Sequence, residues 1–238
     1  MCYTDCTNIA KAEVRAAPPL KRHRPLQIRE SRHVLQEEDG RCRACDRFVA
    51  NPRAFLCEDC ISGPTPDADI AFCVKMFGLA EEQTGVLREA ARGHNIFFTG
   101  AAGTGKSTTL RALVRYLHRK RVHTEVVSPT GIAALNVGGR TMHTFAGWTT
   151  KAVKLPLQRL ERIACGKKNW KRLSWPRVLI IDEISMVSNF MLSRLDHIMR
   201  AARKIDRPFG GVLLCVTGDF HQLPPVKYVS TAHPQGLD

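Results

Sequence analysis

Gly100-Ala101-Ala102-Gly103-Thr104-Gly105-Lys106-Ser107 is the stretch that decides the fold, and it has the spacing G-x-x-x-x-G-K-S. It follows an apolar run at 95–99 and leads directly into helix-forming residues. Strand, glycine loop and helix in this order predict a phosphate-binding loop. The glycines let backbone N–H groups point inward, and the following helix adds the positive end of its dipole. A plain glycine turn before a surface helix would explain the glycines, but not the Lys-Ser pair.

The polar residues of this loop are predicted to bind ATP and Mg²⁺. Lys106 supplies a positive charge for the β- and γ-phosphates, and the Ser107 hydroxyl is a ligand for Mg²⁺. The predicted nucleotide-binding set also includes Gly100, Gly103, Thr104 and Gly105 of this loop and Thr108, which directly follows it.

Apolar strands alternate with helical patterns along the second half of the chain. Strands are predicted at 95–99, 125–128, 178–181 and 212–217, and helices at 80–91, 107–120 and 189–203. Continuously apolar strands of this kind predict an α/β fold with a parallel sheet buried on both faces. Functional groups of such folds gather at the carboxyl ends of the strands.

Two acidic or polar motifs follow predicted strands. Asp182 is placed to hold Mg²⁺, through water, and Glu183 to orient and deprotonate the attacking water. Gln222, in the segment 218–225, is predicted to contact the γ-phosphate or that water and to report hydrolysis. With Lys106, these form the predicted catalytic set. Alone, the acidic pair could be a helix N-cap, and 218–225 could be an ordinary turn.

The net charge of +14 is concentrated in one part of the chain. Residues 88–177 hold 18 lysines and arginines against 3 acidic residues. A basic field confined in this way predicts a polyanion track beyond the nucleotide itself. A solvated basic surface that favours solubility is the alternative.

Four of the nine cysteines form two C-x-x-C pairs, Cys42 with Cys45 and Cys57 with Cys60. Each pair can form a tight turn that aims two thiolates at one tetrahedral ion, so a structural zinc site is predicted over 42–61. A redox dithiol or free cysteines are the alternatives. A disulfide does not fit the reducing compartment in which an ATP site is expected.

The remaining N-terminal sequence predicts a disordered basic tail over 1–41 and a linker over 62–76. No secretory signal or membrane-spanning stretch is visible, so we expect a soluble intracellular protein without a membrane partner. The run Lys21-Arg22-His23-Arg24 is compatible with nuclear import or with a solvated basic patch. The nucleus is the expected location, with the mitochondrion as the alternative.

From about Phe77 to Val226 the chain resembles the first motor domain of the PIF-one family of superfamily-one DNA helicases. The resemblance rests on five ordered segments: 79–83, 128–136, 138–145, 182–186 and 218–226. It implies that Gln83 contacts adenine. It also implies that Thr130, Gly131, Thr141 and His143 contact single-stranded DNA, whose bases stack on aromatic rings. Trp148 is a further candidate ring, whereas we expect Phe145 in the core.

The resemblance implies a RecA-like ATPase domain over 77–238 within an ATP-dependent, 5′-to-3′ DNA helicase of repair, recombination and telomere maintenance. Twelve residues follow Val226, so the second motor domain and its arginines are expected to be missing. We therefore expect this chain to bind Mg·ATP and single-stranded DNA, to hydrolyse ATP weakly and not to unwind duplexes. A non-hydrolysing, nucleotide-dependent nucleic-acid-binding module is the alternative.

Overall fold

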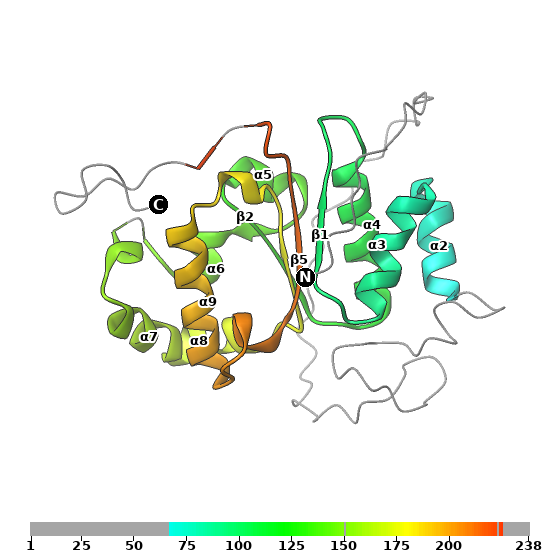
Figure 1. Cartoon of the computed structure of the whole chain (residues 1–238). Helices are drawn as coiled ribbons and strands as arrows, with labels where there is room; N and C mark the ends of the chain where they lie inside the picture. The colour runs from blue at the N-terminus through cyan, green and yellow to red at the C-terminus, as the bar shows by residue number, and fades with distance from the viewer. Residues whose placement is uncertain (1–66, 150, 223, 226–238) are drawn as a thin grey trace.

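A computed structural model describes residues 67–149, 151–222 and 224–225 (Figure 1). Among these residues, five parallel strands form one sheet in the order β1-β5-β4-β2-β3. The strands are β1 (Ile96–Thr99), β2 (Thr124–Ser128), β3 (Arg140–Thr141), β4 (Val178–Ile181) and β5 (Leu213–Gly218). Because all pairs are parallel, the carboxyl ends of the strands share one edge, hereafter the carboxyl edge.

Helices connect the strands and cover both faces of the sheet. The longer helices are α2 (Ala68–Phe77), α3 (Glu81–Ala91), α4 (Lys106–Arg119), α7 (Leu157–Cys165), α8 (Lys167–Ser174) and α9 (Asn189–Arg203). The shorter ones are α5 (Gly131–Asn136), α6 (Met142–Ala146) and the 3-10 turns η1 (Ala152–Lys154), η2 (Ile184–Met186) and η3 (Pro208–Gly211).

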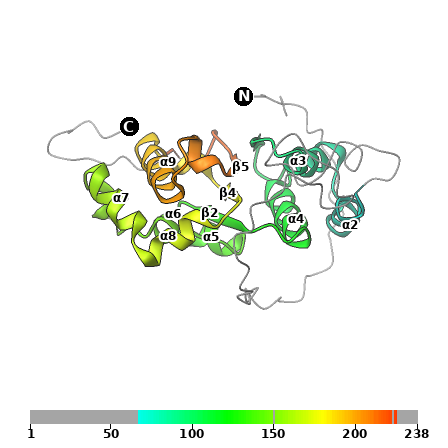
Figure 2. The same cartoon turned by 90° about the horizontal axis from the view of Figure 1, so that it is seen from below.

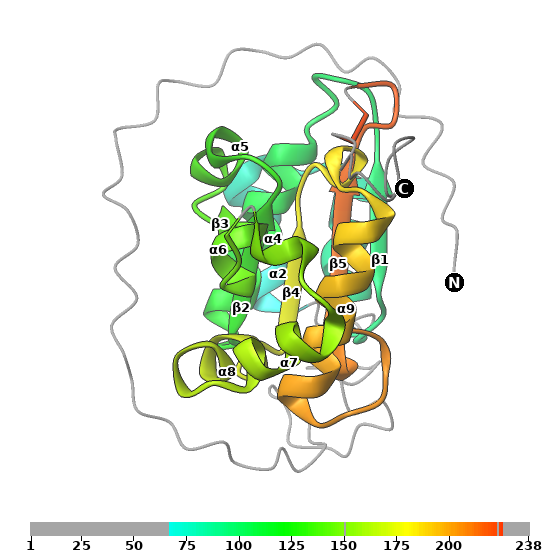
Figure 3. The ribbon, with the colours of Figure 1, turned by 90° about the vertical axis from the view of Figure 1, so that its left-hand side faces the viewer.

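The side chains of β4 show why the sheet is covered on both faces. Val178 and Ile180 belong to one apolar cluster, and Leu179 and Ile181 belong to the other. All four are fully buried, as expected for a strand whose alternate side chains point to opposite, covered faces. Figures 2 and 3 show α2, α3 and α4 on one side of the sheet and α6 to α9 on the other.

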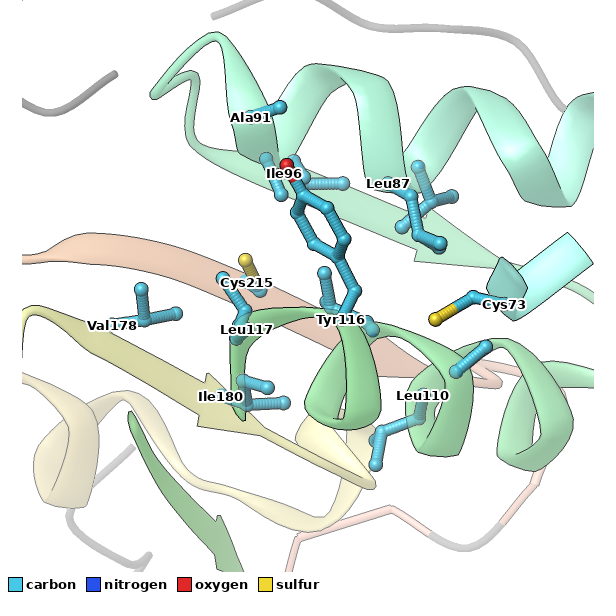
Figure 4. Packing of buried hydrophobic residues seen from close by; sticks show 14 of the residues in the cluster. Cys73, Leu87, Ala91, Ile96, Leu110, Tyr116, Leu117, Val178, Ile180 and Cys215 are labelled. Atoms are coloured by element: carbon cyan, nitrogen blue, oxygen red, sulfur yellow. The ribbon is translucent and has the colours of Figure 1, made fainter. Parts of the chain in front are cut away.

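The first of these clusters joins α2, α3 and α4 to the sheet. Tyr116 points from α4 toward α3, where it lies among Leu87, Ile96 and Leu117 (Figure 4). Its ring is fully buried. This layer fixes α4, and with it the loop that precedes α4, against β1.

The predicted α/β fold with a parallel sheet is confirmed. Predicted elements at 178–181 and 189–203 coincide with β4 and α9. The predicted linker over 62–76 needs correction, because α2 begins at Ala68. The Asp67 side chain caps that helix, and Ile70 and Cys73 are buried in the first cluster.

The predicted tail over 1–41 and the predicted zinc cysteines Cys42, Cys45, Cys57 and Cys60 lie outside the described residues. In the part of the chain that is described, none of the helices combines the length and apolarity that a membrane crossing requires.

Candidate nucleotide-binding site

The glycine loop lies between β1 and α4 at the carboxyl edge of the sheet, at the top of Figure 1. Gly105 has φ +87°, and a Cβ at this position would lie 2.5 Å from the Nε2 atom of Gln83. Glycine therefore suits the backbone conformation, and it also leaves room for the end of the Gln83 side chain. Thr104 tightens the loop, because its N–H and its hydroxyl donate to the Ala101 carbonyl at 3.3 and 2.9 Å.

The start of α4 offers donors to this loop. No side chain caps α4, which begins at Lys106, so the N–H groups of its first turn can bind an anion. Ser107 is exposed and Thr108 is half-buried in that turn. The predicted phosphate-binding residues are thus assembled on one loop and one helix terminus.

Lys106 folds back over the loop. Its ammonium donates to the carbonyl oxygens of Gly100 and Ala101, the second at 3.0 Å. It also interacts electrostatically with Asp182 and Asp219, since its positive charge acts to lower the pKa of each carboxyl group, although the pKa of Asp182 is raised overall. One lysine therefore lies near the acidic residues that end two other strands.

Asp182 is the buried member of the acidic pair after β4. Burial and the neighbouring charge of Glu183 raise the pKa of Asp182 to about 6, although the Glu183 N–H and Lys106 act in the opposite direction. The Glu183 N–H donates to the Asp182 carboxylate at 3.0 Å. A partly desolvated carboxylate of this kind favours a nearby cation, and Mg²⁺ is commonly held by one or two carboxylates together with phosphate oxygens.

Glu183 has an unusual backbone conformation for a residue with a side chain, with φ +54° and ψ +47°. Such a conformation costs about 1–3 kcal/mol and is concentrated at functional sites. It begins the turn η2 and turns the chain sharply at the end of β4. The predicted catalytic carboxylate therefore sits at the most strained corner of the acidic motif.

Asp219 organises the segment after β5. It accepts hydrogen bonds from the His221 N–H at 3.0 Å and from the Gln222 side-chain amide at 2.9 Å. The His221 hydrogen bond is the main reason that the pKa of Asp219 lies below its ordinary value, with Gln222 and Lys106 contributing. The motif at 218–225 predicted a role for Gln222 but none for Asp219, which orients it, although the Gly218-Asp219 pair at the strand end was an available signal.

The ends of β1 and β5 are joined directly. Thr99 pairs with Gly218 in the sheet, and the Thr99 hydroxyl donates to the Gly218 carbonyl at 2.7 Å. Ile181, the last residue of β4, pairs with Val216 of β5. The glycine loop, the Asp182 segment and the Gln222 segment consequently leave three adjacent strands at one edge.

Gln83 lies against the loop from the side of α3. Its amide oxygen accepts from the Ala80 N–H at 3.0 Å, and its amide nitrogen lies 3.4 Å from the Thr104 carbonyl. The structure thus places the residue expected to contact adenine beside the phosphate loop, where it also caps α3.

The residues expected to contact DNA begin the two short helices beyond β2 and β3. The Thr130 hydroxyl accepts from the Ala133 N–H at the start of α5, which contains Gly131. The Thr141 hydroxyl accepts from the Thr144 N–H at the start of α6. Both hydroxyls are therefore engaged as helix caps, and each keeps a lone pair or proton for a further partner.

His143 and its neighbours are more buried than the sequence indicated. Burial lowers the pKa of His143, and its Nε2 atom is buried without a hydrogen-bond partner among the described residues. The ring of Trp148 lies edge-on against His143, with 6.3 Å between ring centroids. Trp148 is 6% exposed, so its suggested role in base stacking is wrong, whereas the expectation that Phe145 is in the core is confirmed.

The helix α5 carries two exposed apolar side chains that sequence reasoning did not identify. Ile132 and Leu135 are 77% and 81% exposed, whereas Ala134 is buried. The apolar residues of this segment are consistent both with DNA contact and with packing on the sheet. The sequence therefore did not distinguish the exposed face of α5 from its buried face.

A glycine loop, an uncapped helix start and acidic strand ends that share one edge of a parallel sheet define the P-loop nucleoside triphosphatase class, of the RecA-like type. Within that class, the model of the family described as PIF1-like helicase matches residues 78–235. The chain belongs to the PIF1-like helicases.

Related sequences support this assignment. The ATP-dependent DNA helicase PIF1 of Candida albicans is 44% identical over 161 residues, which are 67% of this chain and 18% of that protein. The human protein of the same name is 42% identical over 150 residues, 62% of this chain and 22% of that one. The chain spans about a fifth of the length of the curated relatives it matches.

Solved structures agree. The crystal structure of Pif1 helicase from Candida albicans has a TM-score of 0.59 at 44% identity, covering 62% of this chain and 34% of that chain. A Pif1 helicase from Bacteroides, in complex with ADP-AlF3 and single-stranded DNA, has a TM-score of 0.55 at 34% identity. That match covers 66% of this chain and 35% of the Bacteroides chain.

Proposed function

We propose that this chain is the ATP-binding motor domain of an ATP-dependent DNA helicase, and that it binds Mg·ATP and single-stranded DNA. The observation that carries the proposal is the position of Lys106, on the glycine loop and within electrostatic reach of both Asp182 and Asp219. A triphosphate on the loop would lie between this lysine and the ends of β4 and β5. The relatives from Candida albicans and human are named ATP-dependent DNA helicases, which supports the proposal.

The residues have distinct roles in this proposal. Lys106 and the N–H groups at the start of α4 bind the β- and γ-phosphates. The phosphate oxygens replace the carbonyl oxygens of Gly100 and Ala101 as acceptors from Lys106. Ser107 and Asp182 hold Mg²⁺, which neutralises phosphate charge when bound. Glu183 orients the attacking water and accepts its proton.

Gln222 links the phosphate to the rest of the domain. Its side-chain amide is held by Asp219, directly after β5. A change at the γ-phosphate that moves this amide is therefore transmitted to β5 and, through the Thr99–Gly218 contact, back to the loop. In a motor, such a connection couples hydrolysis to movement.

The proposed DNA contacts are Thr130, Gly131, Thr141 and His143, on the starts of α5 and α6. Relatives crystallised with single-stranded DNA support this partner. By the same family reasoning we propose 5′-to-3′ movement for the whole motor and roles in DNA repair, recombination and telomere maintenance. The nucleus is the proposed location, with the mitochondrion as the alternative.

Phosphate release by the purified 238-residue chain, with and without single-stranded DNA, tests the proposal. We expect DNA to stimulate release, and Lys106→Ala and Glu183→Gln to lower the stimulated rate by about 10²-fold or more. Lys75→Ala, which removes an exposed lysine of α2, is the matched control and should retain it. If nucleotide-dependent DNA binding persists but no phosphate is released by the wild type, the chain is a binding module and the motor proposal is wrong.

We also propose that Cys42, Cys45, Cys57 and Cys60 bind one zinc ion, on the strength of their spacing. Elemental analysis should give one equivalent of zinc per chain, and Cys57→Ser/Cys60→Ser should lose it. Equal zinc in both proteins would remove the claim.

A further inference from the structure

The helices α7 and α8 carry a basic surface that the nucleotide site does not use. Nine lysines and arginines lie between Lys151 and Arg177, against one acidic residue, Glu161. That glutamate lies beside His197, with 2.7 Å between its carboxylate and the imidazole Nε2 atom. The positive charge of these helices is therefore hardly compensated from within the same stretch.

The exposed face of α8 combines two of these charges with an aromatic ring. Lys167, Trp170 and Lys171 are exposed and spaced i, i+3 and i+4, so they share one side of the helix. Trp170 is 40% exposed, whereas Leu173, one turn further along α8, is fully buried. Lys168 is also exposed, beside this face.

The lysines of α8 have no acidic partner among the described residues. Lys171 instead stacks on the ring of Trp175, 4.0 Å from its centroid, which holds this ammonium in one position. Lys167 and Lys168 make no ion pair within the part of the chain that the structure describes. We call Lys167, Lys168, Trp170 and Lys171 the α8 surface.

The α8 surface continues the side of the domain where DNA contact is proposed. Arg172 of α8 donates to the Phe145 carbonyl of α6, so α8 is fixed directly against the helix that carries His143. Figure 3 shows α5, β3, α6 and α8 following one another down the same edge of the sheet, with α5 near the carboxyl edge and α8 at the far end.

We infer that the α8 surface binds single-stranded nucleic acid, as an extension of the path that begins at α5 and α6. Lysines that lack carboxylate partners match the phosphates, and an exposed indole between them provides a stacking platform for a base. A basic face kept only for solubility requires no exposed indole. The inference rests on the proposed binding of single-stranded DNA and adds a second contact region to it.

The test compares oligothymidylates of two lengths, on the order of 8 and 20 nucleotides, by fluorescence anisotropy. The charge variant is Lys167→Ala/Lys168→Ala, which leaves the Lys171–Trp175 contact intact. Its control is Lys75→Ala/Arg207→Ala, which removes two exposed charges from other parts of the domain. The ring variants are Trp170→Ala and Trp170→Phe.

We expect the charge variant to bind the long oligonucleotide roughly tenfold more weakly, while its affinity for the short one is unchanged. The slope of log K against log salt should fall by about 1.4, since each lost phosphate contact removes about 0.7. Trp170→Ala should weaken the long complex by about tenfold, and Trp170→Phe should restore most of the affinity. The control should behave as the wild type with both lengths.

Equal affinities of the wild type and the α8 variants for the long oligonucleotide, with unchanged melting temperatures, would overturn the inference. A second result would also overturn it. If polyglutamate competes with the oligonucleotide for the α8 surface and Trp170→Ala changes neither affinity, the surface binds an acidic protein partner instead. If the wild type binds neither oligonucleotide, the proposed function itself fails. If the wild type and the α8 variants all bind normally, the inference about the α8 surface fails and the proposed function stands.

Discussion

The two ends of α4 carry lysines in opposite situations. At the start, Lys106 is half-buried and donates to backbone carbonyls, with the carboxylates of Asp182 and Asp219 near enough to interact electrostatically. Just beyond the end, the Lys120 side chain is 9% exposed and lies between two carboxylates, 2.8 Å from Asp67 and 2.9 Å from Asp69.

This difference separates a chemical role from a structural one. Lys120 joins the start of α2 to the end of α4, and its charge is compensated within the fold. Lys106 has partners that an anion can replace, because neutral carbonyls compete poorly with phosphate oxygens for an ammonium. The same residue type thus stabilises the fold at one end of a helix and is available for a ligand at the other.

The largest expected effect is on stability, at Lys120. Lys120→Met leaves the buried Asp67 without its cation, whereas the half-buried Asp69 keeps Arg119, and we expect the free energy of unfolding to fall by about 3–5 kcal/mol. Denaturant unfolding followed by circular dichroism measures this. Arg119→Met is the matched control, since Arg119 also pairs with Asp69 but is 36% exposed, and it should lose about 1 kcal/mol or less. Equal losses would contradict the structural role of Lys120.

The next effect is on activity, at Lys106. Lys106→Ala should lower the DNA-stimulated rate of phosphate release by about 10²–10³-fold, because it removes one preorganised donor to the phosphates. The free energy of unfolding should change by less than about 1 kcal/mol, as for other residues outside the core. A large loss of stability in this variant would show that the two lysines do not differ in the way proposed.

The Lys120 cluster should also make stability depend on pH. Burial alone would raise the pKa of Asp69, but the hydrogen bonds from Lys120 and Arg119 outweigh it, so the pKa lies below its ordinary value of 3.8. A lowered folded-state pKa contributes stability above pH 3.8, and that contribution is lost as the pH falls through the folded-state value.

The stability difference between wild type and Lys120→Met should therefore shrink below about pH 4. Unfolding curves recorded from neutral pH down to about pH 2.5 would follow it. A stability difference that stays constant over this range would show that the effect of Lys120 does not depend on the ionisation of Asp69.

The smallest effect concerns Gln83, which lies between the nucleotide site and the α2–α4 layer. Gln83→Ala removes its bonds to Ala80 and Thr104 and should lower the free energy of unfolding by about 1 kcal/mol. Gln83→Glu keeps the acceptor for Ala80 and should recover most of this. Nucleotide affinity measured on both variants distinguishes two roles of Gln83, contact with adenine and support of the loop. An equal loss of affinity in the two variants favours contact with adenine, because only Gln83→Glu keeps the bond to Ala80.

Local patterns in the sequence predicted much of the fold. Four consecutive branched aliphatic residues predicted β4, and the helical spacing of apolar residues predicted α9, with the bounds that the structure has. The glycine loop was predicted in the same way, because its strand, turn and helix are adjacent in the chain. These signals need no knowledge of distant partners.

Features that depend on distant partners were not predictable. The Lys120–Asp67 contact joins residues 53 apart, and nothing local marks either as a member of a pair. The strand order and the two-residue strand β3 depend on pairing across the sheet. The burial of Trp148 and the exposure of Leu135 follow from how short helices pack, and an apolar residue on a six-residue helix gives little indication of its face.

The pairing of β1 with β5 has a consequence for biosynthesis. Thr99 and Gly218, which bring the glycine loop to its neighbours, are 119 residues apart. At about 5–20 residues per second, a ribosome needs roughly 6–24 s to supply the second partner after the first. Throughout that interval the nascent loop lacks β5 beside it, so the strand end that carries Asp219 joins the loop only late in synthesis.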